Sequence, residues 1–426
     1  ERTINAAAAQ MPDWNDSLKG DCLWSSVNFG EAVTEVMTPL TASVIRFTLD
    51  DWIFVPGEPT VGVIGGRPYL NISVFATLFY GLGRSRDDLL RFLEATLYMR
   101  LPDDMPVPAI PVSRGTFLRA VFATLQVQRK QRRGVRQAPA YLAANKAWFQ
   151  AVRQTIQAQT SPSGLHELWQ AEIEPHIKTG VWCVLGSASH SADYTLKLRR
   201  ELAKLAGPDD ADVLIANLSE GDAPLESLGP LAGLEKLAQA AISRTAYLEH
   251  YGHRGPHEFE LSVPRPAEDP AWLDRELERL RRSPLGLESL MTGQRRSYES
   301  AWKRLQARSP RAARDLRPRM VESARRARRR ERNRSAYVRD RWAVRLFAVR
   351  AGELAGLGDG VFYLTLDELL ALLSGDRSVT QTIEPRREAY RLYRELPPYP
   401  PVIRGPFDPF AWAADPDRPT DIFDPG

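Results

Sequence analysis

Hydrophobic positions recur every three or four residues along most of the chain, and this spacing predicts a mainly helical protein. It extends over residues 114–159, 165–177, 231–250 and 271–282. A further run, 322–350, contains no Gly or Pro and places an apolar stripe on one face of the expected helix. We expect that stripe to be buried. It consists of Val338, Trp342, Leu346 and Val349.

The first hundred residues follow a different pattern. Residues 23–100 mix β-branched and aromatic stretches with short helical runs, and the segment 61–64 before Gly65-Gly66 predicts a small hairpin. The overall expectation is a mainly α (α+β) fold with many helices and a small β-containing N-terminal subdomain. The predicted divisions are a mixed subdomain (1–101), a helical subdomain (102–240), a second helical subdomain (241–396) and a Pro- and Asp-rich linker (397–426).

Composition narrows the class of protein. Of the 426 residues, 43% are hydrophobic, which is enough for a sizeable core. Cys22 and Cys183 are far apart and lack metal-ligand spacing, so we expect neither a disulfide framework nor a zinc site. No apolar run reaches the roughly 18 residues that span a bilayer. We expect a cytoplasmic protein without a membrane partner, and the initial Glu suggests excision from a longer polypeptide.

Positive charge is concentrated between residues 304 and 350, although the formal net charge is only +4. Nucleic acid is not expected as a partner, because no aromatic platform or known binding motif accompanies the arginines. Arg325, Arg328 or Arg329, and Arg332 recur at helical spacing on another face. That face either meets solvent or lines an anion-binding cleft, and Arg328 and Arg332 are the candidates for the second role.

The segment 251–261, Y-G-H-R-G-P-H-E-F-E-L, concentrates polar chemistry on a constrained loop between two expected helices. Its glycines and proline restrict the backbone, and Arg254 offers a planar fork of donors suited to phosphate. His253 can exchange a proton near neutral pH, and Glu258 or Glu260 can orient either group. A structural Arg–Glu pair that locks the turn is the alternative interpretation.

This segment is similar to the Y-G-H-R-G-P-x-E-x-(D/E)-L signature of phosphoenolpyruvate synthase-like enzymes, and above all of rifampin phosphotransferases. The family usually has a small residue where this chain has His257. Other stretches resemble the family's motifs in the same order along nearly the whole chain. They are Leu23-Trp24 with 28–31 and 37–41, 67–71, 361–365 with 367–369, and Ile383 with Arg386-Arg387.

Enzymes of this family combine three functional domains. The resemblance implies that this chain is the domain that holds the acceptor. An ATP-binding domain and a swivelling phosphohistidine domain are then expected in cis or in trans. The chain has no Walker-type phosphate loop, so we expect it to bind no cofactor itself, while ATP with Mg²⁺ is used elsewhere. His190 superficially resembles the phosphohistidine motif, but the element that should follow it is missing. It is interpreted as a capping or solvent-facing residue before the helix expected at 196–206.

The resemblance places the acceptor between the N-terminal segment and the loop at His253. A hydrophobic surface with a few polar groups is the usual site for a bulky organic ligand. The acceptor itself would be an antibiotic or a natural-product intermediate. The candidate contacts are Trp24, Glu31, Thr38, Pro39, Leu40, Thr41, Phe47 and Trp52.

The implied chemistry is phosphoryl transfer from phosphohistidine to the bound acceptor, with the protein positioning the groups and stabilising charge. Arg254 would bind phosphoryl oxygens, His253 would take a proton or donate a hydrogen bond, and Glu258 would orient one of them. Two alternatives stay open. The chain could serve a tailoring enzyme of secondary metabolism that activates its acceptor by phosphorylation, or it could be a binding module without catalysis.

Overall fold

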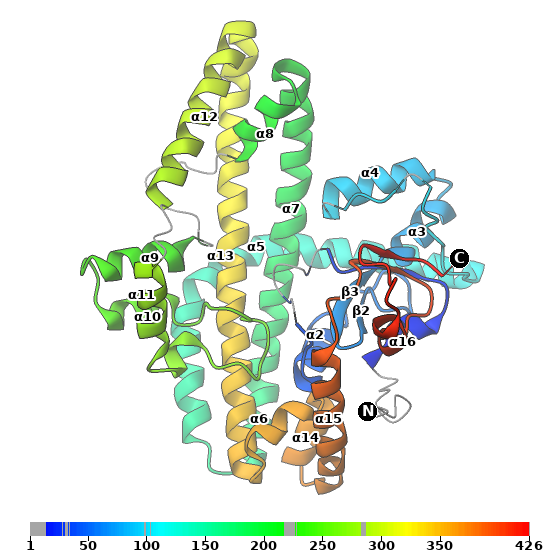
Figure 1. Ribbon diagram of the computed structural model, residues 1–426, viewed down its shortest axis with the longest axis vertical. Coiled ribbons are helices and arrows are strands. Elements are labelled where there is room, and N and C mark those ends of the chain that lie inside the picture. Colours follow the sequence, from blue (N-terminus) through cyan, green and yellow to red (C-terminus); the bar gives the residue numbers. More distant parts are fainter. Residues whose placement is uncertain are drawn as a thin grey trace.

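The structure is a computed structural model that describes residues 14–27, 29, 33, 35–97, 99–102, 104–216, 226, 228–282 and 287–425. Three long helices form its centre: α5 (Arg114–Ala158), α7 (Glu174–Ala206) and α13 (Pro310–Ala355). They pack against one another, although the first part of α5 extends away from the other two (Figure 1). The expected mainly helical fold with a small β-containing part is confirmed.

Helix α13 confirms and extends the run predicted at 322–350. It begins with Pro310, whose missing N–H suits the first helical turn, and ends at Ala355, before Gly356, which adopts φ 73°. Val338 and Trp342 are buried as expected. Leu346 and Val349 are partly buried and pack against the core cluster that contains Trp342. The long helix therefore serves as the central support of the fold.

Small residues bring α5 and α7 close together. A Cβ at Gly134 would lie 2.1 Å from the Trp182 carbonyl oxygen, and one at Gly186 would lie 2.3 Å from the Gln131 carbonyl oxygen. Only glycine permits this separation without a shift of the backbone. The segment around His190, expected to precede a helix, thus lies within α7 instead, because its small residues are packing positions.

Shorter helices complete the two ends of the bundle. At one end, α8 (Pro208–Ala216) and α12 (Leu287–Arg308) share an apolar cluster with α7 and α13. At the other end lie α6 (Pro162–Leu168), α14 (Leu366–Leu373) and α15 (Ile383–Glu395) (Figure 1). The lateral group beside α13 comprises α9 (Gly229–Ala238), α10 (Arg244–Tyr251) and α11 (Trp272–Arg282). None of the described helices has an apolar stretch long enough to cross a bilayer.

The small sheet has the strand order β2-β3-β1-β4-β5. Strands β2 (Val61–Ile64) and β3 (Arg67–Asn71) form the predicted hairpin, with Gly65 and Gly66 at positive φ as a two-residue turn requires. β1 (Leu23–Ser25) pairs antiparallel with β3 and with β4 (Val402–Arg404). The helices of this part are α2 (Pro39–Thr48), α3 (Ile72–Gly81) and α4 (Arg86–Leu97).

The C-terminal tail, expected to be a linker, is part of this sheet. Its strand β5 (Ile422–Phe423) runs parallel to β4, and α16 (Pro409–Ala414) follows β4 in the chain. Phe407 and Trp412 are buried against Trp24 in one apolar cluster. These aromatic contacts outweigh the linker-like Pro and Asp content, so β1 and the C-terminal strands form one subdomain.

Candidate active site

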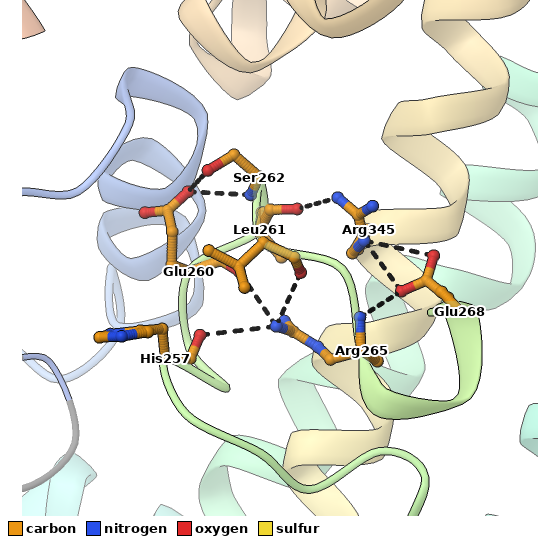
Figure 2. Close-up of polar contacts among 8 residues, drawn as sticks. His257, Glu260, Leu261, Ser262, Arg265, Glu268 and Arg345 are labelled. Carbon is orange, nitrogen blue, oxygen red and sulfur yellow. Dashed lines mark hydrogen bonds and ion pairs between the residues drawn. The ribbon is translucent and has the colours of Figure 1, made fainter. Parts of the chain in front are cut away.

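The loop that carries His253 and Arg254 joins α10 to α11 and lies against α13. Its own Arg265 holds it in shape, because the Nη1 group donates to the carbonyl oxygens of Glu260 and Val263, both at 3.1 Å, and of His257 at 3.5 Å (Figure 2). Arg265 is fully buried, and this burial lowers the pKa of its guanidinium to about 10. The loop is therefore a folded unit rather than a mobile connection.

Two arginines of α13 fix the loop to the bundle. Arg341 donates through Nη2 to the Phe259 carbonyl oxygen at 3.0 Å. Arg345 donates through Nη1 to the Leu261 carbonyl oxygen at 2.7 Å and through Nε to the Glu268 carboxylate at 3.0 Å (Figure 2). These charge-assisted bonds explain why part of the arginine-rich helix is buried instead of solvated.

Glu260 connects the loop to the N-terminal segment. Its carboxylate accepts hydrogen bonds from the Thr38 N–H at 3.0 Å, the Thr38 hydroxyl at 2.8 Å and the Thr41 hydroxyl at 2.9 Å. It also accepts from the N–H and the hydroxyl of Ser262. The negative charge lies at the N-terminus of α2, where the helix dipole favours it. The predicted residues Thr38 and Thr41 thus do meet the loop.

Arg254 and Glu258 form an ion pair within the loop. The Arg254 Nε lies 2.7 Å from Glu258 Oε2, and both side chains are nearly buried, with 11% and 10% exposed. Arg334 of α13 approaches the other carboxylate oxygen at 3.8 Å. The two arginines outnumber the single carboxylate, so this part of the loop carries excess positive charge.

His253 is 2% exposed and faces α13. Its Nε2 lies 3.1 Å from the Ser335 Oγ and 3.4 Å from the Arg339 Nη2. Arginine can only donate, so Nε2 is an acceptor and the ring proton resides on Nδ1. Burial lowers the pKa of His253 well below its ordinary value, and the charges of Arg339 and Arg254 lower it further. The imidazole is neutral at physiological pH.

A buried polar network behind His253 was not predicted from the sequence. Arg339 donates through Nη1 to the Asn145 Oδ1 at 2.8 Å, and Asn145 donates to the Asp340 Oδ1 at 2.6 Å. Tyr141 donates its hydroxyl proton to Asp340, and His176 Nε2 lies 3.3 Å from the same carboxylate. Burial raises the pKa of Asp340 despite these partners. The signal that could have revealed this network was the presence of polar residues beside the apolar stripe of the 322–350 run.

The predicted aromatic contacts are distributed over the core. Trp24 is buried in the sheet subdomain, and Trp52 is half-buried against a second apolar cluster of the same subdomain. Phe47 is half-buried against the bundle, with the Lys178 Nζ 4.2 Å from its ring centre. Pro39 and Leu40 are buried in the first turn of α2, and Leu40 joins the bundle core. Glu31 lies outside the described residues.

The predicted arginines Arg328 and Arg332 lie on α13 before the residues that contact His253. Arg332 is exposed and Arg328 is half-buried. Counting from Arg328, the helical spacing to Arg332, Ser335 and Arg339 places all four on one face. His190 lies apart from this face, as an exposed residue on α7. Among the described residues, no group of three His, Cys, Asp or Glu side chains could hold a metal ion.

The fold and the site define a helical domain in which a neutral histidine and clustered arginines are held on a rigid loop. Residues 151–332 match the family model described as rifampicin phosphotransferase fourth domain. The match confirms the resemblance to rifampin phosphotransferases over the central part of the chain, including the loop of His253 and Arg254. A search of curated proteins finds no match for the chain.

Proposed function

We propose that this chain binds a small-molecule acceptor and positions it for phosphoryl transfer from a phosphohistidine that ATP has charged on another domain or chain. The observation that carries the proposal is the group formed by neutral His253, Arg254 and Arg334 on a loop fixed to α2 and α13. The match to a rifampicin phosphotransferase domain covers the same loop. A bulky antibiotic of the rifampicin type is the acceptor that these observations favour.

Arg254 is proposed to bind phosphoryl oxygens. Its Nε donates to Glu258, so the carboxylate orients the guanidinium and leaves the two Nη groups for a ligand. Arg334 adds a second positive charge beside the pair. Such fixed donors stabilise the charge that develops on a transferred phosphoryl group more effectively than water does, because they do not reorganise during the reaction.

His253 is proposed to donate a hydrogen bond rather than to take a proton. Its Nε2 lone pair already faces Ser335 and Arg339, so the Nδ1–H is the group that remains for a phosphoryl or acceptor oxygen. The lowered pKa keeps the ring neutral, and the protein therefore supplies this donor without a further buried charge. Proton removal from the acceptor would then fall to another group, with the phosphohistidine leaving group as one candidate.

A binding module without catalysis is the second candidate function. The near-complete burial of His253, Arg254 and Glu258 favours it, because these side chains could serve only to lock the loop. Arg254 separates the two candidates: a phosphoryl ligand needs its charge in the transition state, whereas a purely structural pair affects folding alone.

The test supplies this chain with its ATP-binding and phosphohistidine parts and measures the rate of phosphate transfer from labelled ATP to rifampicin. Arg254→Ala should lower the turnover about 100-fold, the usual effect of removing one charge-stabilising donor. Arg244→Ala is the matched control, since Arg244 makes an exposed ion pair with Asp274 on the same lateral group. Thermal unfolding of each variant excludes simple misfolding. An unchanged turnover in a folded Arg254→Ala variant would refute the catalytic assignment.

A further inference from the structure

The first part of α5 extends away from the three-helix centre toward the sheet subdomain. In Figure 1 this cyan part crosses behind the bundle, and the later part of the same helix descends beside α13. Pro139 lies within the helix and accounts for a bend, because it lacks an N–H and its ring crowds the preceding turn. Ala120 packs with Val55 and Val74 on one side of this arm, which leaves the opposite side uncovered.

The uncovered side carries a regular stripe of exposed residues. Leu118, Phe122 and Leu125 are 70%, 56% and 47% exposed. The stripe then continues at the same alternating spacing of four and three residues through basic side chains that are also exposed. These are Arg129, Arg132 and Arg136. Such spacing is that of a coiled-coil seam, along which a second helix packs.

All the charged side chains of α5 are basic. Its sequence contains nine Lys and Arg residues and no Asp or Glu between Arg114 and Ala158. Lys130 pairs with Asp51 of the N-terminal subdomain. Within the part of the chain that the structure describes, no ion pair involves Arg129, Arg132 or Arg136. The basic half of the stripe therefore lacks the neighbouring acids that accompany other arginines, such as Glu322 beside Arg326 on α13.

We propose that the stripe 118–136 of α5, which we call the α5 seam, docks an amphipathic helix of another domain or protein. That helix would be apolar where it meets Leu118, Phe122 and Leu125 and acidic where it meets Arg129, Arg132 and Arg136. The apolar half supplies buried area, and the basic half fixes the register and rejects partners of the wrong charge. This surface is separate from the loop of His253, so the inference does not depend on the proposed function.

Other occupants fit the seam less well. In a parallel pair with a second copy of the chain, the arginines of the two seams would face and repel each other. In an antiparallel pair, the apolar Leu118 would face the charged Arg136. A bilayer surface requires apolar residues along the whole length of a helix, whereas this seam separates apolar and basic residues end to end. A nucleic acid would leave the apolar half without a counterpart. An acidic amphipathic helix satisfies both halves at once.

The test uses the full chain and fluorescein-labelled helical peptides of 21 residues. Each peptide has three leucines and three glutamates at seam spacing, and two versions place the glutamates at opposite ends to cover both orientations. One version should bind, and the variant Arg129→Glu/Arg132→Glu/Arg136→Glu should weaken its binding at least ten-fold. The matched control is Arg311→Glu/Arg314→Glu/Arg317→Glu, which reverses three exposed arginines at the start of α13 and should leave binding unchanged.

A peptide with lysine in place of glutamate should bind the triple glutamate variant of the seam better than it binds the native seam. This rescue keeps the test informative if the variant is less stable. The apolar half is tested separately with Leu118→Gln/Phe122→Gln, which should also weaken binding of the acidic peptide. Equal binding of the acidic peptide to the native chain and to the triple glutamate variant of the seam would overturn the inference. It would also be overturned if the seam variants abolished only self-association, or only binding to phosphatidylserine vesicles or duplex RNA.

Discussion

At His257 the backbone has φ 57°, a conformation that L-residues with bulky side chains rarely adopt. The rifampin phosphotransferase signature usually has a small residue at this position, and the positive φ supplies the physical reason. Histidine tolerates the conformation at some cost, and its ring lies 3.6 Å from the Glu35 carboxylate at the molecular surface. The side chain that departs from the signature therefore lies at the surface of the loop, beside Glu35.

His257→Val should lower the free energy of unfolding by about 1–2 kcal/mol, because a β-branched residue is strained at positive φ. His257→Gly should leave stability unchanged or slightly higher, since glycine adopts this conformation freely. Chemical denaturation of both variants checks the expectation. Equal stability of the Val and Gly variants would contradict the positive φ at position 257.

His253 predicts a dependence of stability on pH. Burial lowers its pKa in the folded state below the ordinary value of 6.5 that applies to the unfolded chain. As the pH falls below about 6.5, the unfolded state therefore takes up a proton that the folded state does not, and the folded state loses stability. Above that pH neither state binds the proton, so this contribution is fully retained.

The measurable result is a fall in the unfolding free energy between pH 7 and pH 5 that His253→Gln reduces. One proton contributes a slope of at most about 1.4 kcal/mol per pH unit. Denaturant titrations at several pH values give the slopes of both proteins. Identical slopes would mean that His253 takes up a proton as readily in the folded state as in the unfolded chain, against the lowered pKa that its burial produces.

At the scale of elements, α5 and α7 depend on close approach at Gly134 and Gly186. An alanine Cβ at Gly134 would overlap the Trp182 carbonyl oxygen, and one at Gly186 would overlap that of Gln131. Gly134→Ala and Gly186→Ala should each lower stability by about 1–3 kcal/mol, as overpacked cores do. Gly293→Ala on α12 meets nothing within 4 Å and should raise stability by about 0.5–1 kcal/mol. Thermal melting of the three variants distinguishes close packing from a general effect of glycine.

Some elements were predictable because local pattern and tertiary environment agree. The apolar stripe at Val338 and Trp342 predicted a buried face of α13, and Gly65-Gly66 predicted the hairpin turn. Strands β4 and β5 were not predictable, because both are short and depend on tertiary pairing. Strand β4 pairs with β1, nearly four hundred residues away, and β5 pairs in turn with β4. His190 was expected outside a helix for a similar reason, since the small residues of α7 resemble a loop until α5 packs on them.

The site was predictable in its residue types but not in its connections. The segment 251–261 indicated a polar loop between two helices, and the structure places it between α10 and α11. Spacing alone did not reveal that Glu260 binds Thr38 and Thr41, because that contact joins positions more than two hundred residues apart. The same holds for the contact between His253 and Arg339.

At the scale of the whole molecule, three segments of the chain converge on the candidate site. The N-terminal segment contributes the start of α2, the central segment contributes the loop, and α13 contributes the arginines that hold it. Glu260 is the point where the first two meet. The acceptor is therefore expected to contact both α2 and the loop, and a change in either one should alter which molecules bind.

The most direct test of this account is an experimental structure of the chain with rifampicin. The proposed function predicts that the antibiotic lies against the N-terminal turn of α2 and the loop 252–268, with one of its hydroxyl groups near Arg254. Rifampicin bound at a different surface, or no binding at saturating concentration, would contradict the proposal that this loop positions the acceptor for phosphoryl transfer.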